Sequence, residues 1–429
     1  MRLTNKDEKI TISIVGAGNR ATAYIKTMER DFKGLFTVVA IFEPKKELQE
    51  YFRKQYSIDE SMIFDDYKYF LKMDRISDVV IIATLDDMHL EPALAAIAKG
   101  YDIILEKPIS KSLEETVRIG ERPKKYDDQL IAVCHVLRHS PFFAKLKEII
   151  DSKRLGEIID IQHNENVGYY HFAHSYVRGN WRNTDIAAPF IVAKSCHDMD
   201  ILLYLLKDKH CLKLSSFGNL TFFNHNNYDD KKMAPRCQDC KIEKDCPYSA
   251  LSIYNSGKMR SVVFNNSSVE TLKNELADSI YGRCVFNSDN NVPDHQVSII
   301  EFENGVHATF NLSAFSNEIH RSIKIMCEYG EIRAIESKEE IEIAPFGKQK
   351  EIIYTEKLAG GHGGADSGFV KNFMNTYIYG QPFDSTLEMS IESHIMAFAA
   401  EYSRINSGEV VEINEFHKDT ISKIRRKNI

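Results

Sequence analysis

The chain has 429 residues, of which 43% are hydrophobic and 27% are charged, and its formal net charge is −7 at pH 7. This length and composition predict about two globular domains with sizeable cores. The negative net charge argues against nucleic acid or an anionic membrane surface as a partner. No leader-type apolar segment and no apolar run of about 18 residues is visible, so we expect a cytoplasmic protein with reduced thiols.

In the first 138 residues, short β-branched runs alternate with stretches of helical periodicity. Strands are predicted at 12–15, 37–42, 78–83, 101–105 and 130–135, with helices at 20–30, 45–56, 88–99 and 112–126. The strands are continuously apolar, which is typical of a parallel sheet covered on both faces by helices. We therefore predict a doubly wound α/β domain over residues 1–138.

A glycine-rich turn closes the first strand at Gly16-Ala17-Gly18 and leads into a helix. Gly16 permits a tight turn, and Gly18 lets the backbone approach a pyrophosphate at the helix N-terminus. Glu43 ends the second strand, where a carboxylate accepts hydrogen bonds from ribose hydroxyls and repels a 2′-phosphate. This pattern predicts a Rossmann domain that binds NAD rather than NADP, with an ordinary surface role for Glu43 as the alternative.

Residues 139–429 have a different pattern, typical of an α+β domain with a mainly antiparallel sheet. A hairpin is expected at 297–312, closed by Asn304-Gly305. The other predicted strands are 157–167, 320–327 and 350–355, and the predicted helices are 141–151, 194–206, 366–378 and 386–406. An irregular loop is expected at 168–189, an insertion at about 225–260, and a solvated basic tail at 423–427.

Four motifs make the chain resemble the Gfo/Idh/MocA family of NAD(P)-dependent oxidoreductases, which act mostly on sugars, cyclitols and their derivatives. The motifs are residues 16–20, Ala83-Thr84 with His89, Glu106-Lys107-Pro108, and residues 196–200 (CHDMD). The resemblance covers nearly the whole chain, and the cysteine-containing insertion suggests a bacterial subgroup. It implies a cofactor site made of Gly16, Ala17, Gly18, Asn19, Arg20, Glu43, Ala83, Thr84, His89, Glu106 and Lys107.

The predicted catalytic residues are Lys107, His197 and Lys194. Lys107 ends a parallel strand, where such sheets bind ligands, and its ammonium can donate to a reacting oxygen or act as a base. His197 can exchange a proton near neutral pH. The family often has an Asp four residues before this His, but the chain has Ala193. Lys194 either replaces that polar group or pairs with Asp198, so the identity of the general base stays open.

The loop at 168–182 and a later glycine-rich loop supply the predicted substrate contacts. Aromatic faces suit sugar C–H groups, and arginine forks suit carboxylates. A structural or dimer-contact role for the first loop is the alternative, and Asp366 in the second is either part of a closing loop or a helix N-cap. The substrate residues expected here are His171, His174, Arg178, Trp181, Arg182 and His362.

Cys237, Cys240 and Cys246 form a cluster within the predicted insertion. A CxxC pair with a third thiol fits three ligands of a structural zinc site. The fourth ligand is open among Cys211, His225 and Cys284. Free thiols that pack a loop are the favoured alternative, so no metal is assigned.

Taken together, the sequence predicts an NAD-dependent oxidoreductase that transfers hydride between nicotinamide and a sugar, cyclitol or sugar-acid derivative. A homodimer or homotetramer formed through the second sheet is expected. Two other functions stay open, an NAD-dependent glycoside hydrolase with transient oxidation and a non-catalytic NAD-dependent binding protein. The presence of both Lys107 and His197 argues against a non-catalytic binding protein.

Overall fold

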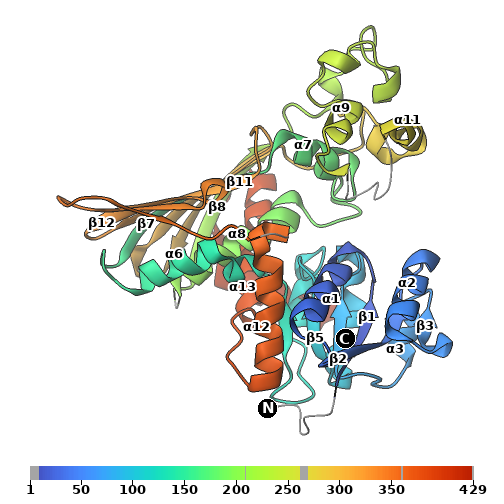
Figure 1. Cartoon of the computed structure of the whole chain (residues 1–429). Helices are drawn as coiled ribbons and strands as arrows, with labels where there is room; N and C mark the ends of the chain where they lie inside the picture. The colour runs from blue at the N-terminus through green and yellow to red at the C-terminus, as the bar shows by residue number, and fades with distance from the viewer. Residues whose placement is uncertain (1–8, 208, 261–268, 359–360, 428–429) are drawn as a thin grey trace.

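The computed structural model describes residues 9–207, 209–260, 269–358 and 361–427. It contains one parallel and one mainly antiparallel β-sheet, with helices packed between and around them (Figure 1). The predicted fold class is therefore confirmed. Within these residues, no helix combines the length and the apolar character needed to span a bilayer.

The N-terminal sheet has six parallel strands in the order β3-β2-β1-β4-β5-β6. β4 (Val79–Ile82) is buried at every position, because helices cover both faces of the sheet. Helix α5 ends at Gly120, not at 126 as predicted, since Pro123 disfavours helical geometry in the residue before it. The remaining elements are β1 (Ile10–Val15), α1 (Asn19–Asp31), β2 (Phe36–Phe42), α2 (Lys46–Tyr56), β3 (Ile63–Phe64), α3 (Lys68–Lys72), α4 (Leu90–Lys99), β5 (Asp102–Leu105), α5 (Leu113–Gly120) and β6 (Ile131–Val133).

The C-terminal sheet has nine strands in the order β14-β13-β12-β11-β7-β10-β9-β8-β15. Only the pair β7–β10 is parallel among these described strands. Strands β8, β12, β13 and β15 were not predicted. The bounds are β7 (Ile158–Asn166), β8 (Cys211–Asn219), β9 (His295–Phe302), β10 (His307–Ser313), β11 (His320–Cys327), β12 (Gly330–Ile335), β13 (Glu340–Pro345), β14 (Glu351–Tyr354) and β15 (Val411–Glu412).

Helices cover one face of this sheet and leave the other open. α8 (Phe190–Leu206) packs on β7, and α13 (Leu387–Ile405) packs on α8 and β8, with α6 (Pro141–Asp151) beside α8. α8 begins four residues earlier than predicted, because Pro189 stands just before its first turn, a position that suits proline. The alternating burial of β9 and β10 reflects this one-sided cover.

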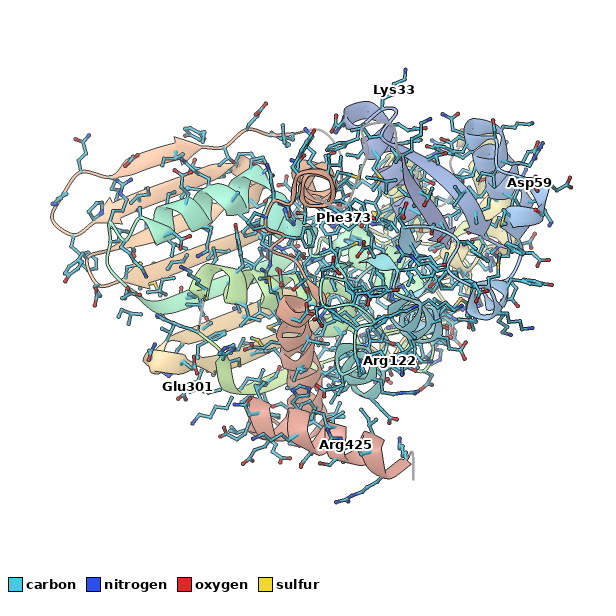
Figure 2. All side chains as sticks on the ribbon, turned by 90° about the horizontal axis from the view of Figure 1, so that it is seen from below. Lys33, Asp59, Arg122, Glu301, Phe373 and Arg425 are labelled. Atoms are coloured by element: carbon cyan, nitrogen blue, oxygen red, sulfur yellow. The ribbon has the colours of Figure 1, made fainter. Side chains whose placement is uncertain are left out.

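The C-terminal helices complete the first domain. α12 (Ala365–Tyr379) places Phe369 and Phe373 in the same core as Ile12 and Tyr24, and Figure 2 shows Phe373 where the two parts of the molecule meet. The predicted basic tail at 423–427 is exposed to solvent as expected, but it is helical, because it forms the end of α14 (Ile413–Lys427), which packs on α5. The packing cores therefore cross the boundary that the sequence suggests at residue 138.

The insertion is longer than predicted and occupies the whole chain between β8 and β9. It contains α9 (Ala250–Asn255) and α11 (Val269–Asp278). In Figure 1 it stands out as a separate lobe at the end of the nine-stranded sheet. The loop expected at 168–189 is partly helical, with α7 (Tyr169–Phe172) and the π-helical turn η4 (Ala173–Arg178) at the base of this lobe.

Candidate active site

The glycine turn lies at the carboxyl end of β1 and has the conformation that its sequence predicts. Gly16 has φ +86°, and a Cβ there would lie 2.7 Å from the backbone nitrogen of Thr84. A Cβ on Gly18 would meet none of the described atoms within 4 Å. Gly16 is thus required by the fold, whereas Gly18 borders open space at the first turn of α1.

Glu43 fixes the glycine turn to the end of β2. Its carboxylate accepts hydrogen bonds from the backbone N–H of Ala17, at 2.9 Å, and of Lys45, at 3.0 Å. The side chain is buried. An anionic group therefore stands at the edge of the sheet where the sequence predicts a cofactor ribose.

These contacts give different expectations for two alanine substitutions. Gly16→Ala combines a positive φ with a backbone clash, so we expect it to lower the free energy of unfolding by about 1–3 kcal/mol and to abolish NAD binding. Gly18→Ala creates no steric clash within the described fold, but it places a methyl group where a pyrophosphate would approach the backbone. We expect unchanged stability with weaker NAD binding, measured by urea unfolding and calorimetric titration. Equal effects of the two substitutions on stability would contradict this assignment.

A buried ionic network joins the glycine turn to the end of β5. The Arg20 guanidinium contacts Glu106 at 2.7 Å and Asp366 at 2.7 Å, and Tyr24 donates a hydrogen bond to Glu106. Burial alone would raise the pKa of Glu106, but Arg20 and the Tyr24 hydroxyl hold it below its usual value. Arg20 thus positions Glu106 and the α12 terminus, and its side chain is engaged within the protein.

Lys107 follows β5. A hydrogen bond of its side chain and contacts of the His89 ring hold this segment in place. The Lys107 ammonium donates a hydrogen bond to the carbonyl oxygen of Ala193, at 3.0 Å. The His89 ring bridges the carbonyl oxygens of Pro108, at 2.9 Å, and Thr84, at 3.2 Å. His89 therefore connects the Ala83-Thr84 turn to the Lys107-Pro108 step.

His197 lies on α8 one turn beyond Ala193 and is buried. Neither of its ring nitrogens has a hydrogen-bond partner among the described residues. The His362 and His135 rings are its neighbours, with centroids 5.6 Å and 5.7 Å away. A buried imidazole whose two nitrogens have no described partner is unusual in a protein core. It indicates a position that contacts a ligand.

The electrostatic surroundings keep His197 neutral. Burial lowers its pKa well below the usual 6.5, and the charges of Lys107 and His362 lower it further. Burial also lowers the pKa of the Lys107 ammonium, although the nearby Glu106 carboxylate opposes that shift. At neutral pH the site therefore offers an imidazole that can accept a proton beside an ammonium that can donate a hydrogen bond.

Lys194 pairs with a strand residue that the sequence did not suggest. Its ammonium lies 3.1 Å from Glu165 on β7, and Arg321 on β11 contacts the same carboxylate at 2.8 Å. The alternative pairing of Lys194 with Asp198 is not present, because Asp198 instead binds Arg321, at 2.7 Å, and His163, at 2.8 Å. Lys194 and His197 share one side of α8, and Asp198 points to the sheet.

The predicted substrate residues divide into two groups. His171 lies near Lys194 and Lys107, whose charges lower its pKa after the larger effect of burial, and its Nδ1 has no hydrogen-bond partner in the described chain. His362 binds Asp366 through Nδ1, at 3.0 Å, beside His197. Trp181 packs on Tyr176, with ring centroids 6.4 Å apart.

The other three predicted substrate residues have their polar groups engaged with the insertion, and their substrate role stays a prediction. His174 bonds the Tyr254 hydroxyl at 2.8 Å. The buried Arg178 guanidinium donates to the carbonyl oxygens of Arg283 and Tyr248. Arg182 binds Asp289 through both carboxylate oxygens, at 2.7 and 3.0 Å, and its fork is therefore satisfied within the protein.

Two family models match this chain along most of its length. The model of the oxidoreductase family with an NAD-binding Rossmann fold, Gfo/Idh/MocA, matches residues 10–135. The model of the C-terminal alpha/beta domain of the same family matches residues 147–413. The chain belongs to the Gfo/Idh/MocA family. It is thus an oxidoreductase whose first domain is an NAD-binding Rossmann fold.

Relatives of this Gfo/Idh/MocA chain are distant in sequence. The YteT protein of Bacillus subtilis is 24% identical over 327 residues, which are 69% of this chain and 72% of YteT. An inositol 2-dehydrogenase/D-chiro-inositol 3-dehydrogenase of Halalkalibacterium halodurans is 22% identical over 206 residues, 47% of this chain and 54% of that protein. The chain spans about half the length of this second relative.

Solved structures share the fold over nearly the whole chain. A levoglucosan dehydrogenase in complex with NADH and levoglucosan aligns with a TM-score of 0.68 at 16% identity, covering 95% of this chain and 100% of that one. An inositol dehydrogenase homolog from Azotobacter vinelandii, complexed with NAD+, aligns with a TM-score of 0.67 at 14% identity, over 94% and 97% of the two chains. These likenesses show that the arrangement of both sheets is shared.

Two buried groups of this Gfo/Idh/MocA site are missing from the sequence-based set, and for a third, Asp366, the sequence suggests only a closing-loop or N-cap role. Glu165 and Arg321 lie on strands β7 and β11, and Asp366 holds Arg20 from the other end of the chain. Arg321 and Glu165 could have been noticed as charged residues at inward positions of alternating strands. Their partners are more than 25 residues away in sequence, so no local pattern identifies the pairs.

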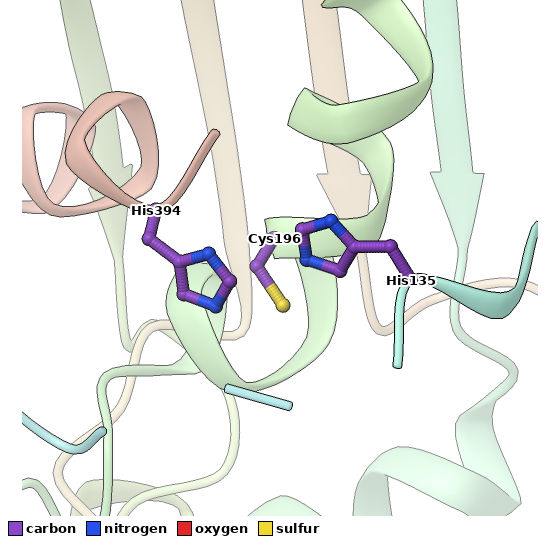
Figure 3. A group of neighbouring side chains, drawn as sticks. All are labelled: His135, Cys196 and His394. Carbon is purple, nitrogen blue, oxygen red and sulfur yellow. The ribbon is translucent and has the colours of Figure 1, made fainter. Parts of the chain in front are cut away.

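A further cluster in this Gfo/Idh/MocA chain places His135 and His394 on either side of Cys196, which lies on α8, and so brings three metal-type ligands together (Figure 3). His394 Nε2 accepts a hydrogen bond from the N–H of Ile109, and its Nδ1 bonds the Ser390 carbonyl. His135 Nδ1 lies 2.7 Å from Asp200. Burial raises the pKa of Cys196 to about 12. With the His394 ring and His135 Nδ1 already engaged within the protein, the cluster packs beneath the proposed reaction centre.

Proposed function

We propose that the chain catalyses hydride transfer between NAD and a secondary alcohol or ketone of a sugar, a cyclitol or a sugar acid. The observation that carries this proposal is a neutral, buried His197 close to Lys107, whose ammonium binds the carbonyl oxygen of Ala193 one turn earlier on the helix that carries His197. Lys107 follows the end of β5, and His197 lies on the helix that faces it. Both residues are therefore at the carboxyl edge of the sheet, where parallel sheets bind their ligands.

The turn after β1 supports NAD as the cofactor. The open space beside Gly18 and the first turn of α1 fit a pyrophosphate. The Glu43 carboxylate suits ribose hydroxyls and would repel the 2′-phosphate of NADP. The Thr84 hydroxyl is buried with no hydrogen-bond partner among the described residues, which indicates a polar group waiting for a ligand. NAD, when bound, supplies the hydride acceptor at its nicotinamide ring.

The protein residues handle the proton and the oxygen. In the oxidation direction, the substrate C–H bond breaks as hydride leaves, and the hydroxyl proton moves to His197 as the C=O bond forms. The Lys107 ammonium donates a hydrogen bond to the substrate oxygen and stabilises the charge that develops on it. Ala193 contributes its backbone carbonyl, which positions Lys107 in place of a carboxylate side chain.

The substrate class rests on the polar groups around His197 and on the named relatives. His171 and Lys194 offer hydrogen-bond donors beside the proposed reaction centre, and Lys194 is held by the buried Glu165. Such donors suit a polyhydroxylated ring or a carboxylate. Relatives named as inositol and levoglucosan dehydrogenases favour a cyclic polyol.

A substrate panel tests the proposal. The purified chain is incubated with NAD and with inositols, anhydrosugars, aldoses or aldonic acids, and NADH absorbance and released sugars are measured. We expect NADH to accumulate with at least one cyclic polyol. Release of sugar from a glycoside without net NADH would favour the hydrolase alternative, and ligand-induced stabilisation without any turnover would favour a binding protein.

We also propose that the open face of the nine-stranded sheet joins copies of the chain. Phe217, Val297 and Ile299 expose 54%, 38% and 58% of their surfaces on neighbouring strands β8 and β9. An exposed apolar patch of this kind is typical of an interface. In light scattering after gel filtration we expect an oligomer that Ile299→Glu converts to a monomer. Tyr379→Glu, which changes an exposed residue at the end of α12 and not on the sheet, should leave the oligomer intact. A monomeric wild-type protein would contradict the proposal.

A further inference from the structure

Four cysteines of the insertion line one small cavity. Cys237, Cys240, Cys246 and Cys284 border a space of about 20 Å³, which has room for one ion or water molecule. The first three come from one segment, where short 3-10 turns Cys237–Asp239 and Glu243–Asp245 reverse the chain. Cys284 comes from the far end of the insertion, and a β-bridge between Arg236 and Arg283 sets it beside Cys237. Of the three candidates for a fourth ligand, Cys284 is thus the one that borders this cavity.

The same cavity is lined by Arg178, whose charge has no counterion among the described residues. The Arg178 side chain is fully buried, and within the described chain no carboxylate lies within 4.0 Å of its guanidinium. Its partners are the carbonyl oxygens of Tyr248, at 2.6 Å, and Arg283, at 2.7 Å, and the sulfur of Cys237, at 3.5 Å. Its Nη1 has no partner among the described atoms. A buried cation without an anion is costly, so negative charge is expected in this cavity.

We propose that Cys237, Cys240, Cys246 and Cys284 bind one Zn²⁺ as a tetrathiolate, with Arg178 balancing part of its charge. Zinc with four thiolates carries a net charge of about −2, and binding releases the thiol protons to solvent. The cavity fits a single ion rather than an iron–sulfur cluster. In the structure, the Cys237 and Cys240 thiols contact the backbone oxygens of Arg283, at 3.5 Å, and Lys232, at 3.9 Å. Metal binding would replace these weak contacts.

The proposed zinc would fasten the insertion to the helices beside the active site. Arg178 ends η4, which continues directly from α7 and His171. Arg178 also joins the two segments of the insertion through the backbones at 248 and 283. The metal would therefore position η4 without touching the reacting groups, and the proposal stands whether or not the chain is a dehydrogenase.

Metal analysis of the full chain tests this inference. The protein is purified without chelating resin, and its metal content is measured by elemental mass spectrometry. We expect about one zinc per chain. Cys284→Ser should lower bound zinc about tenfold or more. The matched controls are Cys211→Ser and Cys327→Ser, which change buried cysteines outside the insertion and should keep the metal. Zinc retained by Cys284→Ser, or iron in place of zinc, would overturn the assignment.

Two measurements keep the test decisive if a cysteine variant fails to fold. Wild-type protein stripped with a chelator and reloaded with Co²⁺ should show the visible absorption of tetrahedral cobalt thiolate. Arg178→Gln, which leaves all four ligands, should weaken zinc about 10–100-fold in competition with a chromogenic chelator. A wild-type chain that contains no metal after purification and gains no cobalt spectrum would refute the site.

Discussion

Replacing His197 with asparagine is expected to lower kcat for alcohol oxidation by about 10²–10⁴-fold while NAD affinity stays unchanged. The imidazole is buried and neutral, and in the described chain both of its ring nitrogens lack partners. Asparagine keeps a polar side chain of similar size but cannot accept the substrate proton. The measurement is steady-state kinetics with the substrate found in the panel, together with calorimetric titration of NAD.

His210→Asn is the matched control, because His210 is an exposed histidine paired with Glu392 far from β5. It should leave kcat within about twofold of the wild-type value, as expected for a surface substitution. The pH dependence adds a second readout. Since burial holds the pKa of His197 below 6.5, the oxidation rate should persist as pH falls through 6.5 and decline only below it. A His197→Asn enzyme with wild-type kcat and the same acid limb would rule out the proton-acceptor role.

Replacing Arg321 with methionine is expected to lower the free energy of unfolding by about 3–5 kcal/mol, because it leaves buried charges unpaired. Arg321 lies on β11 and contacts Asp198 at 2.7 Å and Glu165 at 2.8 Å, and both carboxylates are fully buried. Glu165 in turn holds Lys194. The change should therefore also raise KM, through a displaced Lys194, more than it lowers kcat.

Urea unfolding of Arg321→Met is compared with that of Arg333→Met. Arg333 is an exposed arginine on the neighbouring strand β12 and pairs with Glu331, so its loss should cost about 0–1 kcal/mol. Burial alone would raise the pKa of Asp198, but Arg321 and His163 hold it far below its usual 3.8. This stabilisation is present above pH 3.8 and is lost as pH falls toward the folded-state pKa. Equal unfolding free energies for the two variants would contradict a structural role for the Arg321 network.

The fold was largely predictable because its first half repeats a simple pattern. Continuous apolar strands alternate with helices, and Gly16 is forced by a positive φ and a close backbone, so the local sequence and the final structure agree there. The second sheet was harder, because β8, β12 and β13 have mixed polarity. Their pairing with strands far along the chain determines them.

The residues of the candidate site also divide into those that local sequence patterns predict and those that depend on long-range contacts. Lys107 and His197 could be placed from strand ends and helix spacing, whereas Glu165, Arg321 and Asp366 enter through contacts between distant segments. Arg178 shows a feature that the sequence did not indicate. An arginine in a polar loop suggested a substrate contact, but the insertion folds over it and buries its charge beside four cysteines. No pattern near residue 178 signals that burial.

Transfer of deuterium from the substrate carbon to the cofactor tests the central claim most directly. The chain is incubated with NAD and the identified polyol, deuterated at the reacting carbon, and the cofactor is analysed by mass spectrometry. Direct hydride transfer predicts about one deuterium in each NADH formed, with the yield per unit time reduced about 10²–10⁴-fold in His197→Asn. Product formation with a cofactor that is returned oxidised and unlabelled would contradict this account.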